Sequence, residues 1–249
     1  MEAYKTCGGY MRVINGPSYS ISHMLPMHDR HNIVKAAQIC YKSERDMSDP
    51  EEEKEFISRL HRDGHSVIEH SMVSIKMVCD RGVSHQLVRH RVGCSFAQES
   101  TRYCNYSKNK FNNEITVVRP WRIFDDKSPE YQVWYNSCLQ AEQAYFKLLD
   151  FGVRPETARG VLPTSLKTEL ILTTNLKEWY HILDQRTRKD VHPDTRALCV
   201  QILSELGDRF AYPEIFGDLA SERVAEFIQD DRKARERYFE THPIEGNQE

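Results

Sequence analysis

Residues 89–102 hold the densest group of side chains that could do chemistry: three arginines, one histidine and several hydroxyl residues. The segment begins with Arg89-His90-Arg91 and ends with Ser100-Thr101-Arg102. Arginine stays charged at physiological pH, and its planar fork of donors fits two phosphate oxygens at once, while hydroxyl groups add neutral donors. The composition therefore predicts a site for a phosphorylated ligand. The alternative is a solvated basic helix end.

The residues before this segment predict the elements that present it. Apolar side chains alternate through residues 71–79, which is the period of a half-buried strand. Gly82 predicts a turn, and Val83 and Leu87 predict the apolar stripe of a short helix that ends at the arginine-histidine triplet. A polar loop containing Gly93 follows. Strand, helix and polar loop together are a common way to present side chains to a ligand.

Capping residues predict most of the remaining helices. Asp49-Pro50 followed by three glutamates is typical of a helix start, and Gly64 of its end. Ser128-Pro129 begins the longest predicted helix, which ends at Gly152. Shorter helices are predicted from Pro155, over 176–183, and from Pro193 with the stripe Cys199, Ile202, Leu206 and Phe210, and a strand is predicted over 115–118.

These elements predict an α+β fold with a small antiparallel sheet and a helix-rich C-terminal half. A chain of 249 residues with 39% hydrophobic residues is long enough for a sizeable core. Because no linker or internal repeat is evident, we expect one domain over residues 1–249. Its charged C-terminal tail, at about 230–249, is expected to be an exposed helix that frays.

The charge balance narrows the class of partner. The formal net charge is -3 and the sequence pI is about 6.4, so the arginine cluster is a local feature of a weakly acidic chain. Nonspecific nucleic-acid binding relies on a broad positive surface, and we therefore expect no nucleic-acid partner.

Cysteine usage and hydropathy indicate a cytoplasmic protein. The seven cysteines include no Cys-x-x-Cys pair, and the start of the chain lacks an apolar signal segment, so we expect reduced thiols. No apolar run approaches the roughly 20 residues that a membrane span needs. A transmembrane role is excluded on this ground.

The eleven histidines do not show the spacing of a metal site. His61 and His65 have the helical spacing of four, but Gly64 ends the predicted helix between them. Pairs such as His85 and His90 are five apart, which turns them about 140° from each other on a helix. Neither a His-Glu-x-x-His segment nor a cysteine pair adds ligands. The sequence therefore predicts no protein-bound metal.

Nucleophilic catalysis is also not indicated. Ser100 lacks a Gly-x-Ser-x-Gly turn and has no identified base, so we interpret it as a phosphate donor. Cys94 and Cys104 lie near cationic residues that could activate a thiol, but cysteine is often a small apolar filler.

Four ordered segments resemble the flavin-dependent thymidylate synthases. The family signature, Arg-His-Arg followed by a spacer and Ser-x-Arg, is similar to Arg89-His90-Arg91 with Ser100-Thr101-Arg102. Residues 64–70 resemble the family's upstream Gly-His segment, and residues 157–163 resemble its Ala-Arg-x-x-Leu-Pro segment. Asn175, His181 and Arg186 also fall at matching positions. Eight residues separate the two halves of the signature where the family usually has seven, and we expect the extra residue at Gly93-Cys94.

The resemblance implies reductive methylation of dUMP to dTMP. Methylenetetrahydrofolate would donate the carbon, and FAD reduced by NADPH would supply the hydride. A homotetramer with sites at subunit junctions is also implied. The residues implied to contact FAD are Ser66, Arg89, His90, Arg91, Gln98, Asn175, Lys177 and His181. Those implied to surround dUMP are Gln86, Arg89, Gln98, Glu99, Ser100, Thr101, Arg102, Arg159 and Arg186.

Three of these arginines are implied to have distinct roles. Arg102 and Arg159 would neutralise the nucleotide phosphate. Arg186 would be catalytic, because a guanidinium at the pyrimidine edge can stabilise negative charge that develops on the uracil ring.

The rival hypothesis is a non-enzymatic nucleotide- or nucleic-acid-binding protein. It would use Arg89, Arg91 and Arg102 for phosphates only. The aromatic residues that could stack bases beside them are Tyr103, Tyr106 and Phe111. A yellow protein with flavin absorbance favours the enzyme, whereas a colourless one that binds polynucleotides with steep salt dependence favours the rival.

Overall fold

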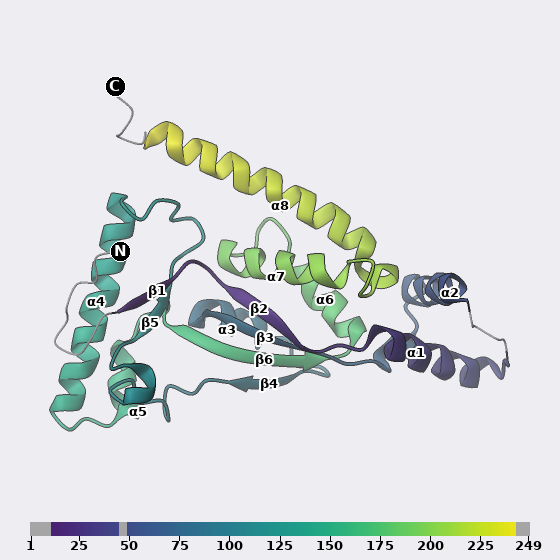
Figure 1. Ribbon diagram of the computed structural model, residues 1–249, viewed down its shortest axis with the longest axis horizontal. Coiled ribbons are helices and arrows are strands. Elements are labelled where there is room, and N and C mark those ends of the chain that lie inside the picture. Colours follow the sequence, from purple (N-terminus) through teal and green to yellow (C-terminus); the bar gives the residue numbers. More distant parts are fainter. Residues whose placement is uncertain (1–10, 45–48, 243–249) are drawn as a thin grey trace. The chain divides into compact units, whose positions relative to one another are not determined.

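The structure, a computed structural model, describes residues 11–44 and 49–242 (Figure 1). The described residues form two compact units. The first unit contains 11–18, 77–88 and 97–170, and the second contains 19–44, 49–76, 89–96 and 171–242. The division falls inside strands β3 (Val73–Asp80) and β6 (Lys167–Thr174). A single domain over 1–249 therefore stays a prediction.

The main sheet has four strands in the order β2-β3-β6-β4. Its edge strands are β2 (Ser18–His23) and β4 (Ser95–Gln98). Ser74 contacts Thr173 at 2.7 Å between the hydroxyl oxygens, and the Arg81 amide donates to the Leu166 carbonyl at 3.1 Å. Residue numbers rise from Ser74 to Arg81 while those of their partners fall from Thr173 to Leu166, so β3 and β6 are antiparallel. The predicted small antiparallel sheet in an α+β fold is confirmed.

The first unit packs helices around a short parallel pair of strands that the sequence did not predict as parallel. This pair is β1 (Arg12–Ile14) with β5 (Thr116–Val118), in register from Arg12 with Thr116. Its helical elements are α3 (Arg81–Leu87), η2 (Asn109–Phe111), α4 (Pro129–Asp150), α5 (Pro155–Ala158) and η3 (Arg159–Val161). Buried Ile115, Val117 and Tyr145 are at the centre of its core.

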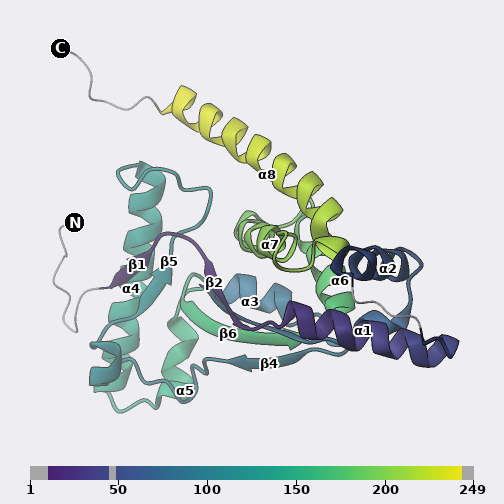
Figure 2. The same cartoon turned by 45° about the vertical axis from the view of Figure 1, so that its right-hand side comes forward.

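The second unit is mainly helical. Its elements are α1 (Pro26–Tyr41), α2 (Pro50–Arg62), η1 (Ser66–Glu69), α6 (Leu176–Arg186), α7 (Pro193–Leu206) and α8 (Pro213–Thr241). Helix α7 packs against both α6 and α8, and α2 packs against α1 and α8 (Figure 2). Trp179 is fully buried here, and its indole donates to the Val73 carbonyl at 3.0 Å, which joins α6 to β3.

Local signals located several elements correctly. Strand β3 buries Val73, Ile75 and Met77 on one face, as the alternation predicted. Asp49 caps α2 and Ser128 caps α4 through their side chains. The helix-rich C-terminal half is confirmed.

Three local predictions were wrong. Gly82 lies inside the first turn of α3 and not in a turn between elements. Phe210 is 73% exposed and lies beyond α7, which ends at Leu206. Among the described helices, α8 with 29 residues is longer than α4 with 22.

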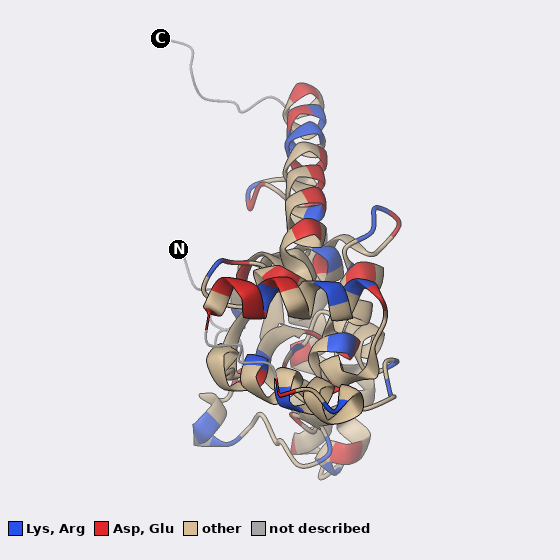
Figure 3. Cartoon of the chain, turned by 90° about the vertical axis from the view of Figure 1, so that its right-hand side faces the viewer, with Lys and Arg blue, Asp and Glu red and all other residues tan. Residues whose placement is uncertain are grey.

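Helix α8 includes the first part of the predicted charged tail. It continues to Thr241, and residues 243–249 of that prediction lie outside the described part of the chain. Acidic and basic residues alternate along the helix (Figure 3). No helix within residues 11–44 or 49–242 is long and apolar enough to cross a bilayer.

Candidate functional site

The arginine-histidine triplet begins one residue after the C-cap of α3, as predicted. Asp80 starts this helix by accepting the Val83 amide at 2.7 Å. Arg89 and Arg91 are exposed, whereas His90 between them is only 7% exposed. The triplet therefore separates into two solvated cations and one buried imidazole.

The predicted polar loop after the triplet is a turn followed by a strand. Gly93 has a φ of 65°, in the left-handed region that favours glycine. The Thr174 hydroxyl, at the end of β6, donates to the Gly93 carbonyl at 2.9 Å. This bond fixes the turn that leads into β4.

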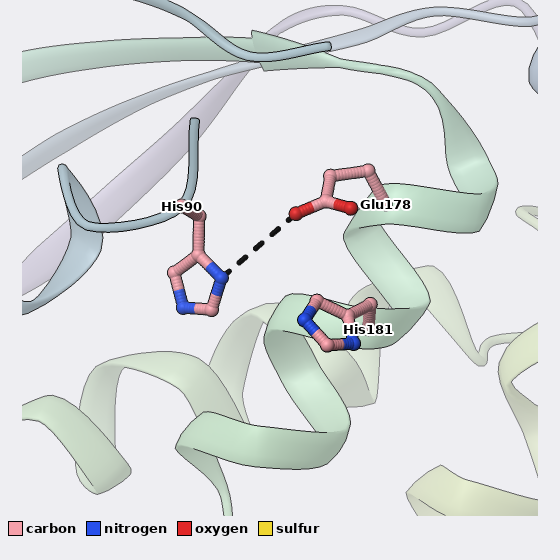
Figure 4. A group of neighbouring side chains, drawn as sticks. All are labelled: His90, Glu178 and His181. Atoms are coloured by element: carbon pink, nitrogen blue, oxygen red, sulfur yellow. Dashed lines mark ion pairs between the residues drawn. The ribbon is translucent and has the colours of Figure 1, made fainter. Parts of the chain in front are cut away.

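Helix α6 brings three residues to His90, and we call these four the His90 cluster. Arg186 Nε donates to His90 Nε2 at 3.0 Å. On the other side of the ring, Nδ1 lies 3.8 Å from Glu178 Oε1 (Figure 4). The His181 ring stands edge-on to the His90 ring, with centroids 5.7 Å apart. Glu178 and His181, three residues apart, share one face of α6, and Arg186 reaches His90 from the last turn of the same helix.

The His90 imidazole is neutral in this arrangement. Burial, which is the largest cause, and the positive charges of Arg186 and His181 together lower the pKa of His90 from about 6.5 to about 4. Since Nε2 accepts from Arg186, the ring hydrogen is on Nδ1 and faces Glu178. A buried neutral acceptor thus holds the Arg186 side chain.

The depressed pKa of His90 predicts a loss of stability in acid. Below about pH 6.5 the unfolded chain binds a proton on this imidazole that the folded chain excludes down to about pH 4, so the free energy of unfolding falls through this window. His90→Gln cannot be protonated in this range and should lose this component of the pH dependence. Denaturant unfolding at several pH values would compare them. Parallel pH profiles would contradict the assignment.

His90, Glu178 and His181 also form the metal-capable group of the described residues, with ligand atoms within 4.8 Å of one another. Histidine spacing along the chain could not reveal this group, because α6 and the triplet are far apart in sequence. The hydrogen bonds disfavour an ion. A metal on His90 Nδ1 would move the ring hydrogen to Nε2, where two N–H groups, those of His90 and Arg186, would face each other. The positive charge of the guanidinium would also repel the metal cation.

We therefore expect the protein to retain its ligand binding and activity after exhaustive chelation. Thermal unfolding of chelated protein with and without added Zn²⁺ should give the same midpoint, since a specifically bound ion would stabilise the fold. A loss of activity on chelation that only a divalent ion restores would overturn this expectation.

A cavity of about 260 Å³ lies beside the cluster in the second unit. Its lining residues are His61, Gly64, His65, Ile68, Lys177, Tyr180, His181 and Asp184. The His61 and Tyr180 rings meet edge-on with centroids 4.5 Å apart, and burial lowers the pKa of His61. The Lys177 ammonium donates to the Gly64 carbonyl at 3.2 Å. The planar rings suit a planar aromatic ligand. The Lys177 ammonium, which also pairs with Glu69 at 3.2 Å, supplies a positive charge in a lining that also contains Asp184.

Four predicted FAD residues lie on η1, on α6 or at the N-cap of α6, the segments that contribute to the lining of this cavity. Lys177 and His181 line it, whereas Ser66 is exposed in η1 and is not among its lining residues. Asn175 caps α6 by accepting the Glu178 amide at 2.8 Å, which is a structural role. His61, Tyr180 and Asp184 were missed, because sequence spacing alone gave them no partner.

The Ser100 turn, residues 100–103, is the second centre and belongs to the first unit. The Tyr103 and Cys104 amides donate to the Ser100 carbonyl at 3.2 and 2.9 Å. Arg159 donates to the Thr101 hydroxyl at 3.1 Å, and Arg102 Nε lies 3.2 Å from Glu156. The fold thus brings together Thr101, Arg102 and Arg159, three of the residues predicted to surround dUMP.

Gln98 and Glu99 have protein partners in the same unit. The Gln98 amide donates to Ser84 at 2.8 Å and to Thr168 at 3.2 Å. Glu99 accepts from the Tyr106 hydroxyl at 3.1 Å and pairs with Lys167 at 3.0 Å. These contacts hold the strand that enters the Ser100 turn. Gln86 is half-buried in α3.

The aromatic residues of the rival hypothesis fit it poorly. Tyr106 is 4% exposed, packs edge-on against Phe111 at 5.1 Å, and has a raised pKa because of burial and Glu99. Only Tyr103 of the three, 76% exposed, presents its ring to solvent. One exposed ring is a weak platform for stacking successive bases.

Comparison with known families places most of the chain. Residues 21–210 match the family described as thymidylate synthase complementing protein. The flavin-dependent thymidylate synthase of Geobacter sulfurreducens is 31% identical over 193 residues, covering 75% of this chain and 80% of that protein. The enzyme of the same description from Thermococcus onnurineus is 34% identical over 146 residues. The match spans 57% of this chain and only 58% of the Thermococcus protein.

A solved structure shares the fold. It is described as a UMP/dUMP methylase, PolB from Streptomyces cacaoi, bound with 5-Br dUMP. The TM-score is 0.65 at 23% sequence identity, with 87% of this chain and 98% of that chain covered. At this identity the likeness supports the fold alone.

Proposed function

Because the chain belongs to the thymidylate synthase complementing protein family, we propose that it is a flavin-dependent thymidylate synthase that methylates dUMP to dTMP. The observation that carries the proposal is the hydrogen bond from Arg186 to the buried, neutral His90. It holds a permanent cation in a fixed direction, as stabilisation of a developing anion requires.

The second unit offers a suitable place for the flavin. The cavity beside the His90 cluster combines imidazole and phenol rings with the Lys177 ammonium, which fits a planar, anionic cofactor. We propose that Lys177 and His181 hold FAD, together with Arg89, His90 and Arg91 and, from the family resemblance, Ser66, Gln98 and Asn175. When bound, FAD reduced by NADPH would supply the hydride, and methylenetetrahydrofolate the carbon.

The Ser100 turn is proposed to bind the nucleotide. Arg102 and Arg159 would pair with the dUMP phosphate, and Ser100 and Thr101 would donate neutral hydrogen bonds. Gln98 and Glu99, which have protein partners, would contribute by holding the turn in place. Gln86 and Arg89 complete the proposed set around dUMP.

Arg186 is the proposed catalytic residue. Negative charge builds up on the uracil ring as the new bond forms. The Arg186 guanidinium, already oriented by His90, stabilises this charge without having to reorganise. The mechanism requires no nucleophile from the protein. Ser100 accordingly acts as a donor only.

The proposed assembly follows the family resemblance, and the proposed location follows the cysteine usage of the sequence. We propose a homotetramer in which one site draws residues from more than one chain, in the cytoplasm. Sedimentation of the purified protein would measure the assembly state directly.

Ser100→Ala is expected to retain measurable turnover. The loss of one neutral hydrogen-bond donor costs about 0.5 to 1.5 kcal/mol, or up to roughly tenfold in rate. The substitution also removes the contact from the Arg102 amide to Ser100 Oγ at 3.3 Å, so part of the loss would appear in dUMP affinity. Steady-state kinetics would separate the two effects. An inactive Ser100→Ala with normal dUMP binding would bring back a serine nucleophile.

One assay tests the proposed function as a whole. Tritium release from dUMP labelled at the methyl-accepting carbon should require the folate donor, NADPH and FAD together. The purified protein should be yellow, with flavin absorbance. A colourless protein that releases no tritium and binds polynucleotides with steep salt dependence would overturn the proposal.

A further inference from the structure

Arg196 is a buried cation that the proposed chemistry does not use. Only 3% of the residue is exposed, and it lies in the first turn of α7. A positive charge is unfavourable there, because the N-terminus of a helix carries positive partial charge. Its burial also carries a desolvation cost that only well-placed partners offset. The residues that contact Arg196 must therefore stabilise its charge, and they indicate its role.

All three nitrogens of the Arg196 guanidinium have a partner. Nε donates to the Thr187 carbonyl at 2.9 Å. The terminal nitrogens pair with Asp230 at 2.9 Å and with Glu226 at 3.3 Å, both on α8. The guanidinium also lies over the Phe227 ring, 5.4 Å from its centroid. One planar fork thus joins α7, α8 and the end of α6.

The contact with α6 occurs where that helix ends. Thr187 is the C-cap of α6, and the last carbonyls of a helix have no partner within it. Arg196 satisfies the Thr187 carbonyl, and the Thr187 hydroxyl donates to the Leu183 carbonyl at 2.7 Å. Arg186 is the residue immediately before this cap. Fixing the cap therefore fixes the backbone from which the proposed catalytic side chain extends.

We propose that Arg196, held by Asp230 and Glu226 of α8, is a positioning residue for Arg186. Helix α8 then has a part in the reaction, although its residues are not among those that line the cavity. Hydrogen bonds that orient a catalytic group matter because misplacement of about 1 Å can cost roughly 100-fold in rate. This inference rests on the proposed function of Arg186.

Helix α8 supplies both the test variant and a matched control. Asp230 pairs with Arg196. Its side chain is 28% exposed, so its replacement by alanine leaves no buried cavity. Its neighbour Asp231 pairs at 2.7 Å with Arg235, one turn further along the same helix. Asp230→Ala and Asp231→Ala therefore remove the same charge from adjacent positions, but only the first loosens Arg196. Arg196→Lys is the second test variant, because its donors sit on one nitrogen and cannot reproduce the planar fork whose three nitrogens reach Thr187, Asp230 and Glu226.

Two measurements decide the proposal. Hydrogen exchange of the Thr187 amide reports the end of α6 without any assay of activity, and single-turnover oxidation of reduced flavin with saturating dUMP reports the chemical step. Asp230→Ala and Arg196→Lys should each accelerate the exchange and slow the single turnover by about fivefold or more, since charged hydrogen bonds are lost. The dUMP dissociation constant should not change. Asp231→Ala should match the parent protein in both measurements.

The outcomes separate the two proposals. Faster exchange with an unchanged single-turnover rate would show that the Arg196 contacts are purely structural and would overturn the inference. Equal behaviour of Asp230→Ala and Asp231→Ala would overturn it as well. If the parent protein did not methylate dUMP, the proposed function would fall, and the link from α8 to the end of α6 would be judged by exchange alone.

Discussion

Arg186→Ala is expected to slow the chemical step by a factor of about 100 to 1,000, which is the usual cost of removing one preorganised donor from a developing anion. The effect should appear in single-turnover oxidation of reduced flavin with dUMP and folate donor at saturation. Flavin content should be retained. Arg186 contacts His90 through Nε, so lysine, which lacks the planar fork, should not rescue the rate.

Arg188 provides the matched control for this result. It lies two residues further along, has 52% of its side chain exposed and pairs with Asp184. Exposed ion pairs contribute little, so Arg188→Ala should stay within about twofold of the parent protein. Nearly normal turnover by Arg186→Ala, or an equal loss in both variants, would remove Arg186 from the mechanism.

Helices with local caps were predictable from sequence, and helices fixed by distant contacts were not. The Asp49 cap of α2 and the Ser128 cap of α4 are local signals. Helix α1 was missed, because it has no side-chain cap and buries two charged residues, Asp29 and Arg30, that interrupt its apolar face. Arg30 pairs at 2.6 Å with Glu214. Its partner lies at the other end of the chain.

The missed strand β6 has the same explanation. Its buried face includes Thr168 and Thr174, both fully buried, so the expected apolar alternation is broken. Thr168 accepts from Arg81 and Gln98, and Thr174 donates to Gly93. Buried hydroxyls are tolerated because these partners satisfy them. The partners are visible only once the chain is folded.

Gly82 was misread, and Gly207 was not considered, although packing explains both glycines. A Cβ on Gly82 would lie 3.0 Å from Asp80 Oδ1 and 3.1 Å from Thr164 Cγ2, so the residue is small because α3 is crowded there. A Cβ on Gly207 would lie 2.6 Å from the Ala220 Cβ. This close approach of α8 accompanies the end of α7, and it explains why the predicted stripe does not continue to Phe210.

The candidate site was predictable in part. The family resemblance implied His90 and Arg186 as site residues, and the structure joins them directly. The sequence could not indicate that His90 is buried and neutral, or that Glu178 faces the other side of the His90 ring. The protonation state depends on desolvation and neighbouring charges, which are properties of the folded chain.

The assignment of Arg102 depends on register, because the spacer before it is one residue longer than usual in the family. We expect Arg102→Ala to keep its flavin and to weaken dUMP binding. The loss of a hydrogen bond between charged groups costs about 1.5 to 3 kcal/mol, or roughly 10- to 150-fold in the dissociation constant. Calorimetric titration with dUMP would measure it.

Arg154 makes this a controlled experiment. Arg102 lies 3.2 Å from Glu156 with 59% of its side chain exposed, and Arg154 lies 3.6 Å from the same carboxylate with 83% exposed. Both substitutions leave Glu156 with one guanidinium fewer, but only Arg102 belongs to the Ser100 turn. Arg154→Ala should therefore bind dUMP within about twofold of the parent protein, as expected for an exposed ion pair. Unchanged affinity in Arg102→Ala would show that the extra residue shifts the register, and Arg159, bound to Thr101, would then be the remaining phosphate ligand of the turn.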